Sequence, residues 1–103
     1  MTNFEVEGSN DRVTGTLLVN STLAYMLFDC GATHSFVARK FAKTLNVQPE
    51  WLDNPYCAYA PGDRVLVSHL KYNNCLVEIE NRTLQANLVE INMSDFDVIL
   101  GID

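Results

Sequence analysis

An apolar run that ends in one acidic residue sets the strongest limit on how this chain can fold. Residues 23–29 read LAYMLFD and are almost continuously apolar, which is typical of a strand buried on both faces. Asp29 ends the run, and Cys30 and Gly31 follow it. A carboxylate there is costly to keep charged without partners, and the nearby glycine lets backbone N–H groups approach it. The sequence therefore predicts a tight turn in which Asp29 takes part in chemistry by holding or giving up a proton. The alternative is that Asp29 only caps the turn or the helix that follows.

Short strands separated by turn residues dominate the rest of the pattern. Asn20-Ser21-Thr22 separates two apolar runs, and Pro61-Gly62-Asp63 separates two runs of strand-forming residues. Both triplets are turn signals, so each predicts a hairpin. We expect Pro49 and Pro55 to bracket a loop ahead of the second hairpin. The predicted strands and hairpins, in chain order, are 13–19 with 23–29, 56–70 turned at 61–63, 75–80 with 83–91, and Val98-Ile99-Leu100 closed by Gly101.

One segment has the periodicity of an amphipathic helix. Apolar residues recur at four-residue spacing between Ser35 and Leu45, and the basic residues fall on the other side. We expect Thr33 or Ser35 to cap this helix and Asn46 to adopt the left-handed turn at its end. The apolar positions are Val37, Phe41 and Leu45, and the basic ones are Arg39, Lys40 and Lys43. One helix among about seven strands predicts a mostly β domain.

Length and charge limit the class of protein further. The 103 residues are enough for one small domain. Seven basic residues against thirteen acidic ones give a net charge of −6, so we expect no nucleic-acid contact by this domain. No stretch is apolar for long enough to span a bilayer, and we expect no membrane contact. Residues 1–12 are polar and lack the features of a signal peptide, so we expect a loose segment ahead of a folded domain over 13–103, in the cytoplasm.

The three cysteines do not form a recognisable metal or disulfide pattern. Cys30, Cys57 and Cys75 are odd in number and widely spaced, with no C-x-x-C and no His pair at metal-ligand spacing. We expect free thiols in a reducing compartment. The sequence predicts neither a bound metal nor a cofactor.

Two blocks of sequence resemble a known family. The first is LFDCGATHSFV at 27–37, and the second is DFDVILG at 95–101, with the hairpin around APGD at 60–63 between them. In order and spacing they resemble the retropepsin-like aspartic proteases, most closely those of plant gypsy-type retrotransposons. The resemblance runs from about Val13 to Asp103. It implies the retropepsin-like acid-protease fold, a closed, barrel-like β lobe with one main helix and one lobe per chain.

The resemblance also implies an activity. Family members are aspartic endopeptidases in which two identical chains bring their motif aspartates side by side. Two carboxyl groups at so short a distance cannot both be ionised, so the pair shares one proton, as is established for aspartic proteases. One carboxyl group then acts as base on a water molecule, and the other acts as acid toward the peptide carbonyl. The expected partners are therefore a second copy of the chain and a polypeptide, here the polyprotein of a retroelement.

Individual roles follow by matching this sequence to the family motifs. Asp29 is the expected catalytic residue, in an active-site loop with Cys30 and Gly31. The expected substrate-binding residues are Gly31, Ala32, Thr33 and His34. The expected flap comprises Tyr59, Ala60, Pro61, Gly62, Asp63 and Arg64, and the expected supporting strand comprises Val98, Ile99, Leu100 and Gly101.

The chain departs from the family at two places. Position 30 usually carries Ser or Thr, whose hydroxyl locks the two active-site loops together, and Cys30 is a weaker donor. Relatives also continue beyond the position of Asp103 through a helix and a closing strand. We expect lowered rather than abolished activity. The alternatives are a catalytically silent domesticated domain that serves as a binding or dimerisation module, and thiol chemistry at Cys30 with His34 as base, which lacks an orienting third group.

Overall fold

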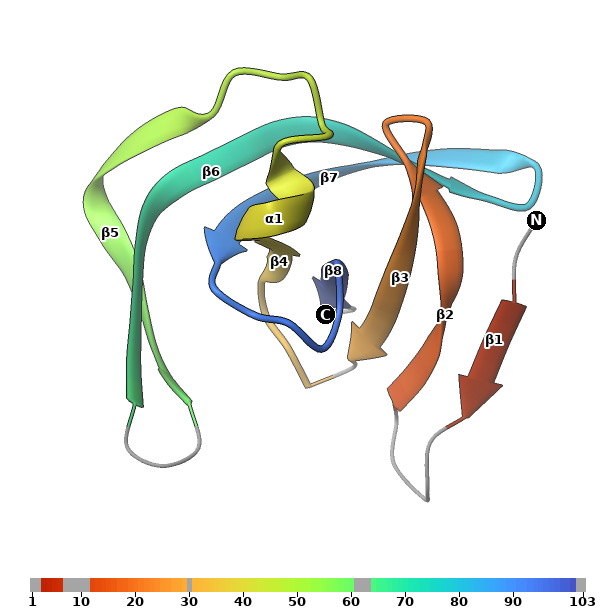
Figure 1. The fold of residues 1–103 in the computed structure, drawn as a ribbon, viewed down its shortest axis with the longest axis horizontal. Helices are drawn as coiled ribbons and strands as arrows, with labels where there is room; N and C mark the ends of the chain where they lie inside the picture. The colour runs from red at the N-terminus through yellow and green to blue at the C-terminus, as the bar shows by residue number, and fades with distance from the viewer. Residues whose placement is uncertain (1–2, 7–11, 30, 61–63, 102–103) are drawn as a thin grey trace.

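The chain folds into a strongly curved sheet with one short helix (Figure 1). The computed structural model describes residues 3–6, 12–29, 31–60 and 64–101, with side chains for 13–29, 31–57 and 65–101. The elements in these ranges are β1 (Asn3–Val6), β2 (Arg12–Val19), β3 (Thr22–Asp29), β4 (Ser35–Ala38), α1 (Arg39–Ala42), β5 (Glu50–Ala60), β6 (Arg64–Ile79), β7 (Arg82–Ile91) and β8 (Val98–Gly101).

The sheet closes on itself into a barrel-like lobe. Its strand order is β1-β2-β3-β8-β4-β7-β6-β5, and β2 also pairs with β6. That pairing joins Leu18 to Glu78 and Val19 to Val77 in register, so six strands from β2 to β6 form a ring, with β1 and β5 outside it. Asn20 seals the junction, because its side chain accepts the Leu76 N–H at 2.7 Å and donates to the Leu45 carbonyl at 2.8 Å. The predicted mostly β, barrel-like fold is confirmed.

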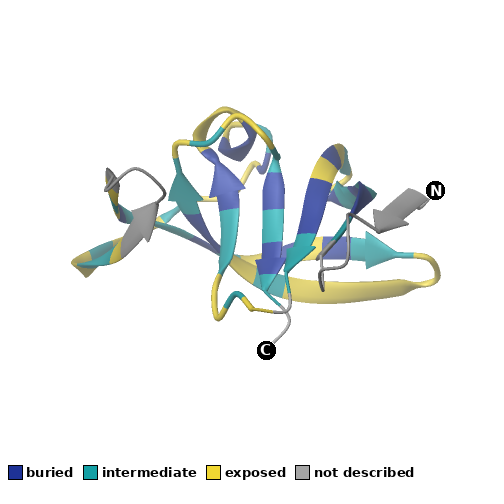
Figure 2. Cartoon of the chain, turned by 90° about the horizontal axis from the view of Figure 1, so that it is seen from below, coloured by how far each residue is buried: buried dark blue, intermediate teal, exposed yellow. Residues whose placement is uncertain are grey.

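Apolar side chains fill the inside of the ring. Leu17, Met26, Val37, Leu88 and Val98 come from five different strands, and each is at most 1% exposed. Figure 2 shows buried segments alternating with half-buried ones along the central strands. Large apolar residues brought together from five strands supply most of the hydrophobic stabilisation. This core holds the strands that carry the two sequence blocks.

The predicted helix over 35–45 is wrong in its first half. Ser35–Ala38 is strand β4, which pairs with β7 on one side and β8 on the other. Two ladders of backbone hydrogen bonds outweigh the local helical spacing, and Phe36 and Val37 are good strand formers. The helix covers only Arg39–Ala42 and begins after Ala38, without a side-chain cap. Asn46 does adopt the expected left-handed conformation, with φ 57°.

The three predicted hairpins are confirmed as antiparallel pairs, β2 with β3, β5 with β6, and β6 with β7. The predicted turn at 61–63 lies outside the described residues. Two other expectations fail. Residues 3–6 form strand β1 against β2 rather than a loose segment, and β3 is not buried on both faces, because Leu23 is 59% and Tyr25 43% exposed.

A long hairpin extends beyond the ring. This arm, defined as β5 with residues 64–71 of β6, lies at the left of Figure 1 and ends at the lower side of the molecule, as does β3. The loop predicted between Pro49 and Pro55 is wrong, because β5 already begins at Glu50 and carries a register shift between Trp51 and Tyr56. Trp51 stacks on His69 across the arm, with ring centroids 4.4 Å apart.

Strand β8 passes between β3 and β4. It runs parallel to β3, with Asp29 beside Gly101, and antiparallel to β4, with Phe36 beside Ile99. The segment that joins β3 to β4 must therefore cross over the end of β8. A Cβ atom at Gly101 would lie 2.5 Å from the Ala32 carbonyl oxygen and 2.7 Å from that of His34. Only glycine fits under this crossing.

Replacing Gly101 tests the crossing. We expect Gly101→Ala to lower the free energy of unfolding by about 1–3 kcal/mol, because the added methyl group must displace backbone atoms. Urea unfolding measures this change. Ser35→Ala is the matched control, since it removes only the hydroxyl that accepts the Gly101 N–H at 3.1 Å and should cost about 1 kcal/mol. An unchanged stability for Gly101→Ala would contradict the observed packing.

Tyr72 links stability to alkaline pH. Burial, the hydrogen bond to Glu90 and the charge of Glu90 raise the pKa of Tyr72 from 10.0 to about 12. A raised pKa in the folded state stabilises the protein below pH 10, and this contribution is lost as pH rises from 10 to 12. We expect it to reach about 3 kcal/mol. Urea unfolding between pH 9 and 12 should show a shallower decline in Tyr72→Phe than in the unmodified chain, and an equal decline would contradict the link.

Candidate active site

Asp29 lies at the last position of β3, where the chain turns sharply. The Gly31 N–H donates to Asp29 Oδ1 at 2.9 Å, and the Ala32 N–H donates to the Asp29 carbonyl at 3.2 Å. The carboxyl group is thus oriented by its own turn and is half-buried. Capping of the helix by Asp29 is excluded, because α1 begins after Ala38. Cys30 lies outside the described residues.

Residues 31–34 form the loop that crosses β8. The Ala32 and His34 carbonyl oxygens face Gly101 at close range, and the Gly101 N–H donates to Ser35 Oγ. A Cβ atom at Gly31 would sit 3.4 Å from Asp29 Oδ1, which is ordinary contact, so Gly31 serves the turn through its N–H. Strand β8 therefore supports the loop through Gly101, and the Gly31 N–H orients the Asp29 carboxylate.

Two of the predicted substrate-binding residues are held by neighbours. Thr33 Oγ1 lies 3.0 Å from His34 Nδ1. The edge of the His34 ring meets Tyr56 of β5 at a centroid distance of 4.8 Å, and Tyr56 also meets Phe36 of β4 at 5.3 Å. Loop, barrel and arm therefore join in one aromatic cluster. Tyr56 was given no role from the sequence, because it stands at the start of the strand predicted to follow the loop between Pro49 and Pro55.

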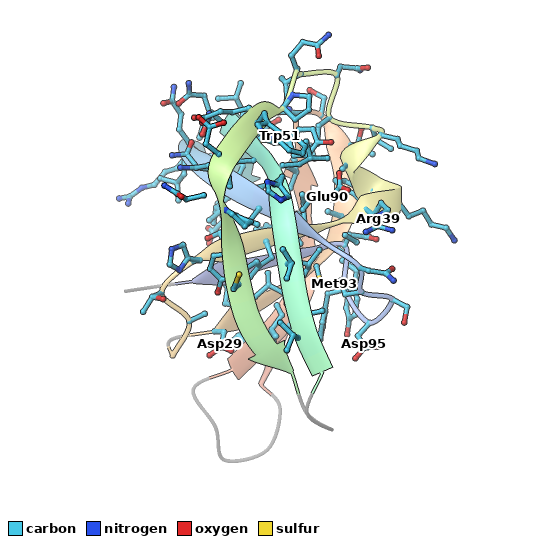
Figure 3. The ribbon with its side chains drawn as sticks, turned by 90° about the vertical axis from the view of Figure 1, so that its left-hand side faces the viewer. Asp29, Arg39, Trp51, Glu90, Met93 and Asp95 are labelled. Carbon is cyan, nitrogen blue, oxygen red and sulfur yellow. The ribbon has the colours of Figure 1, made fainter. Side chains whose placement is uncertain are left out.

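The predicted flap falls at the free end of the arm. Tyr59 pairs with Val65, and Ala60 with Arg64, in the backbone ladder, whereas Pro61, Gly62 and Asp63 lie outside the described residues. Figure 3 shows the arm in front of the barrel, with the label of Asp29 near its lower end. The arm and the Asp29 turn are thus at the same end of the molecule.

The predicted supporting strand, Val98 to Gly101, is β8, and the residue before it anchors the strand. Asp97 donates its N–H to the Tyr25 carbonyl at 2.8 Å and accepts the Tyr25 N–H on Oδ2 at 2.9 Å. Its carbonyl also accepts the Ala38 N–H at 2.8 Å. Sequence reasoning included Asp97 in a motif without assigning it a role. These bonds set the register that places Gly101 beside Asp29.

Two cavities in the described part of the chain do not include Asp29 among their lining residues. The larger, about 560 Å³, lies between the arm and the barrel, with Arg39, Trp51 and Glu90 among its lining residues. The smaller, about 330 Å³, is lined by Phe28, Leu100 and others from β6 and β7. The chemistry of the Asp29 turn, rather than cavity size, identifies the candidate site, and a site formed between two copies would not appear as a cavity in one.

Among the described residues, no three His, Cys, Asp or Glu side chains lie together as a bound metal ion would require. In the same residues, no helix is both long and apolar enough to cross a membrane.

The comparison with protein families agrees with the geometry. The family model for the retroviral aspartyl protease matches residues 1–103. No curated protein matches the chain. The match covers both sequence blocks and the strands that hold them, including the turn in which Asp29 accepts a backbone hydrogen bond over Gly101. This chain therefore belongs to the retroviral aspartyl protease family.

Proposed function

We propose that this chain is one subunit of a homodimeric aspartic endopeptidase that processes the polyprotein of a gypsy-type plant retrotransposon. The observation that carries the proposal is the Asp29 turn: a half-buried carboxylate at a strand end, oriented by the Gly31 N–H, with Gly101 beside Asp29 in the neighbouring strand. One chain supplies a single such turn within the family motif. A second copy completes the site about a two-fold axis. The enzyme would act in the cytoplasm, within retroelement particles.

The paired carboxyl groups would carry the reaction. With one proton between them, the ionised Asp29 takes a proton from water as the water oxygen bonds to the peptide carbonyl carbon. The protonated partner gives its proton to the carbonyl oxygen, so a neutral gem-diol forms. Asp29 then gives its proton to the amide nitrogen, while one gem-diol hydroxyl gives its proton to the ionised partner carboxylate. The C–N bond breaks, the acid and amine products form, and the pair again holds one proton. No bond between enzyme and substrate forms.

The arm is suited to the role of flap. Its free end lies at the same end of the molecule as Asp29 (Figure 3), and its Tyr56 contacts His34 of the loop. A hairpin that closes over an extended peptide would exclude water from the reacting bond. Residues 59–64 would form the closing end, and Gly31, Ala32, Thr33 and His34 would line the channel below it.

A catalytically silent domain is the second candidate, because Cys30 replaces the usual hydroxyl residue of the motif. Such a domain would keep the barrel and the dimer but bind peptides without cleaving them. Thiol chemistry at Cys30 is a third. Alkylation of the cysteines separates it from the proposed mechanism, because an aspartic protease does not use a thiol nucleophile and should still cleave.

Replacing Asp29 tests the proposal. We expect Asp29→Asn to abolish cleavage of an unstructured protein at mildly acid pH while leaving the fold intact, because an amide can neither share the proton nor take one from water. Gel analysis of the products and circular dichroism measure the two effects. Glu80→Gln, at an exposed acid in the β6–β7 turn, is the matched carboxyl-to-amide control. Full activity of Asp29→Asn would end the assignment to aspartic proteases.

Assembly should limit activity. Since one chain holds half a site, the specific activity should rise with protein concentration and follow the dimer fraction. Sedimentation velocity over the same concentrations measures that fraction. Cleavage by a species that sediments as a monomer would contradict the paired-carboxyl mechanism, and a dimer that binds a statine peptide without cleaving substrate would favour the silent domain.

A further inference from the structure

Strand β6 bends where it leaves the barrel and enters the arm. It pairs with β7 over Lys71–Ile79 and with β5 over Arg64–Lys71, and its register shifts between Tyr72 and Cys75. Asn74 at the shift is left-handed, with φ 59°. A register shift with a left-handed residue bends a strand locally. The bend therefore lies next to the base of the arm, where Lys71 pairs with both β5 and β7.

Polar side chains bridge this bend from several elements. Asn73 donates to Glu50 Oε1 of β5 at 2.8 Å, and the Asn74 N–H donates to the Asn87 side chain of β7 at 2.9 Å. Both contacts are exposed to solvent, so each stabilises only modestly. They define the bend without fixing its angle strongly.

Glu90 makes the more protected contacts. Its Oε1 accepts from the Tyr72 hydroxyl at 2.9 Å, and its Oε2 lies 3.4 Å from Arg39 Nε. Tyr72 is 8% exposed, and the Glu90 side chain is 12% exposed. A carboxylate with so little solvent depends on its partners, and removing one of them is costly. One residue of β7 thus connects Tyr72 of β6 with the start of α1; Figure 3 shows Glu90 close to Arg39.

The other strand of the arm, β5, contacts the loop that follows Asp29. Tyr56 of β5 packs on His34, two residues from Ala32 and in the loop that begins at Asp29. A rotation of the arm at the bend would therefore move Tyr56 relative to His34. The angle of the bend thus determines how close the arm lies to the loop.

We propose that Glu90 is a positioning residue, which sets the angle of the arm through Tyr72 and Arg39 and so controls how the arm covers a bound peptide. This inference rests on the proposed function, and it adds a residue that touches neither substrate nor Asp29. Loosening the bend should weaken peptide binding and leave the chemical step alone. We expect Tyr72→Phe and Glu90→Gln to raise KM about tenfold and to change kcat less than about twofold.

The variants separate the two contacts of Glu90. Glu90→Gln keeps an acceptor for Tyr72 but loses the charge that pairs with Arg39, Tyr72→Phe removes only the hydroxyl, and Arg39→Gln removes only the cation. Lys40→Gln is the matched control, since it changes a neighbouring exposed cation of α1. The full chain is used as the dimer, with KM and kcat measured on one peptide and hydrogen exchange measured over residues 65–70.

Both readouts can overturn the inference. Faster exchange over 65–70 together with raised KM in the Glu90 and Tyr72 variants, and neither effect in Lys40→Gln, supports it. A lower melting temperature with unchanged KM and unchanged exchange in the arm would show a structural role only and would refute it. If the unmodified dimer cleaves nothing, the proposed function fails by itself, and the exchange data, with the affinity for a statine peptide in place of KM, still decide whether Glu90 positions the arm.

Discussion

The contact between Gly101 and the carbonyl oxygens of the loop is the constraint on which the rest of the structure depends. Strand β8 can lie between β3 and β4 only if the segment joining those two strands crosses above its end. The crossing brings backbone to backbone, and a side chain at position 101 would fill the space. Asp29 lies beside this crossing because it is the last residue of β3 before the chain crosses β8. The position of the acid thus follows from topology, and its orientation follows from the Gly31 N–H.

In this way a small acidic chain holds an oriented carboxyl group without burying it deeply. In one subunit Asp29 is half-buried and held by a single backbone donor from its own turn. The proposed mechanism needs a second carboxyl group close to this one, so that the two can share one proton. In the proposed dimer, two-fold symmetry would supply that group from an identical chain. The proposed dimer therefore explains why a domain of this size needs only one acid in its motif.

Sequence reasoning located the strands better than it located the helix. Strands with alternating or continuous apolar residues between clear turns, such as 13–19 and 23–29, were predicted because their signals are local. The helix over 35–45 was misjudged, because Val37 has helical spacing to Phe41 and Leu45. In the structure Phe36 and Val37 instead pair with β7 and β8, and that pairing is visible only in three dimensions. The same holds for the site: Asp29 was evident from its motif, whereas Tyr56 and Glu90 act through partners far away in sequence.

The arm explains why such long-range polar contacts are present at all. Val65 and Val67 are more than half exposed, and so is Trp51, so the arm has little core of its own. A hairpin with few buried apolar contacts opens at low free energy, and its average position is then set by contacts at its base. In this chain polar, directional contacts stand beside the aromatic contacts of Tyr56, and the most protected polar contacts converge on Glu90. A directional anchor would restrict the angle of the arm while leaving its free end able to move, as the proposed flap over a peptide requires.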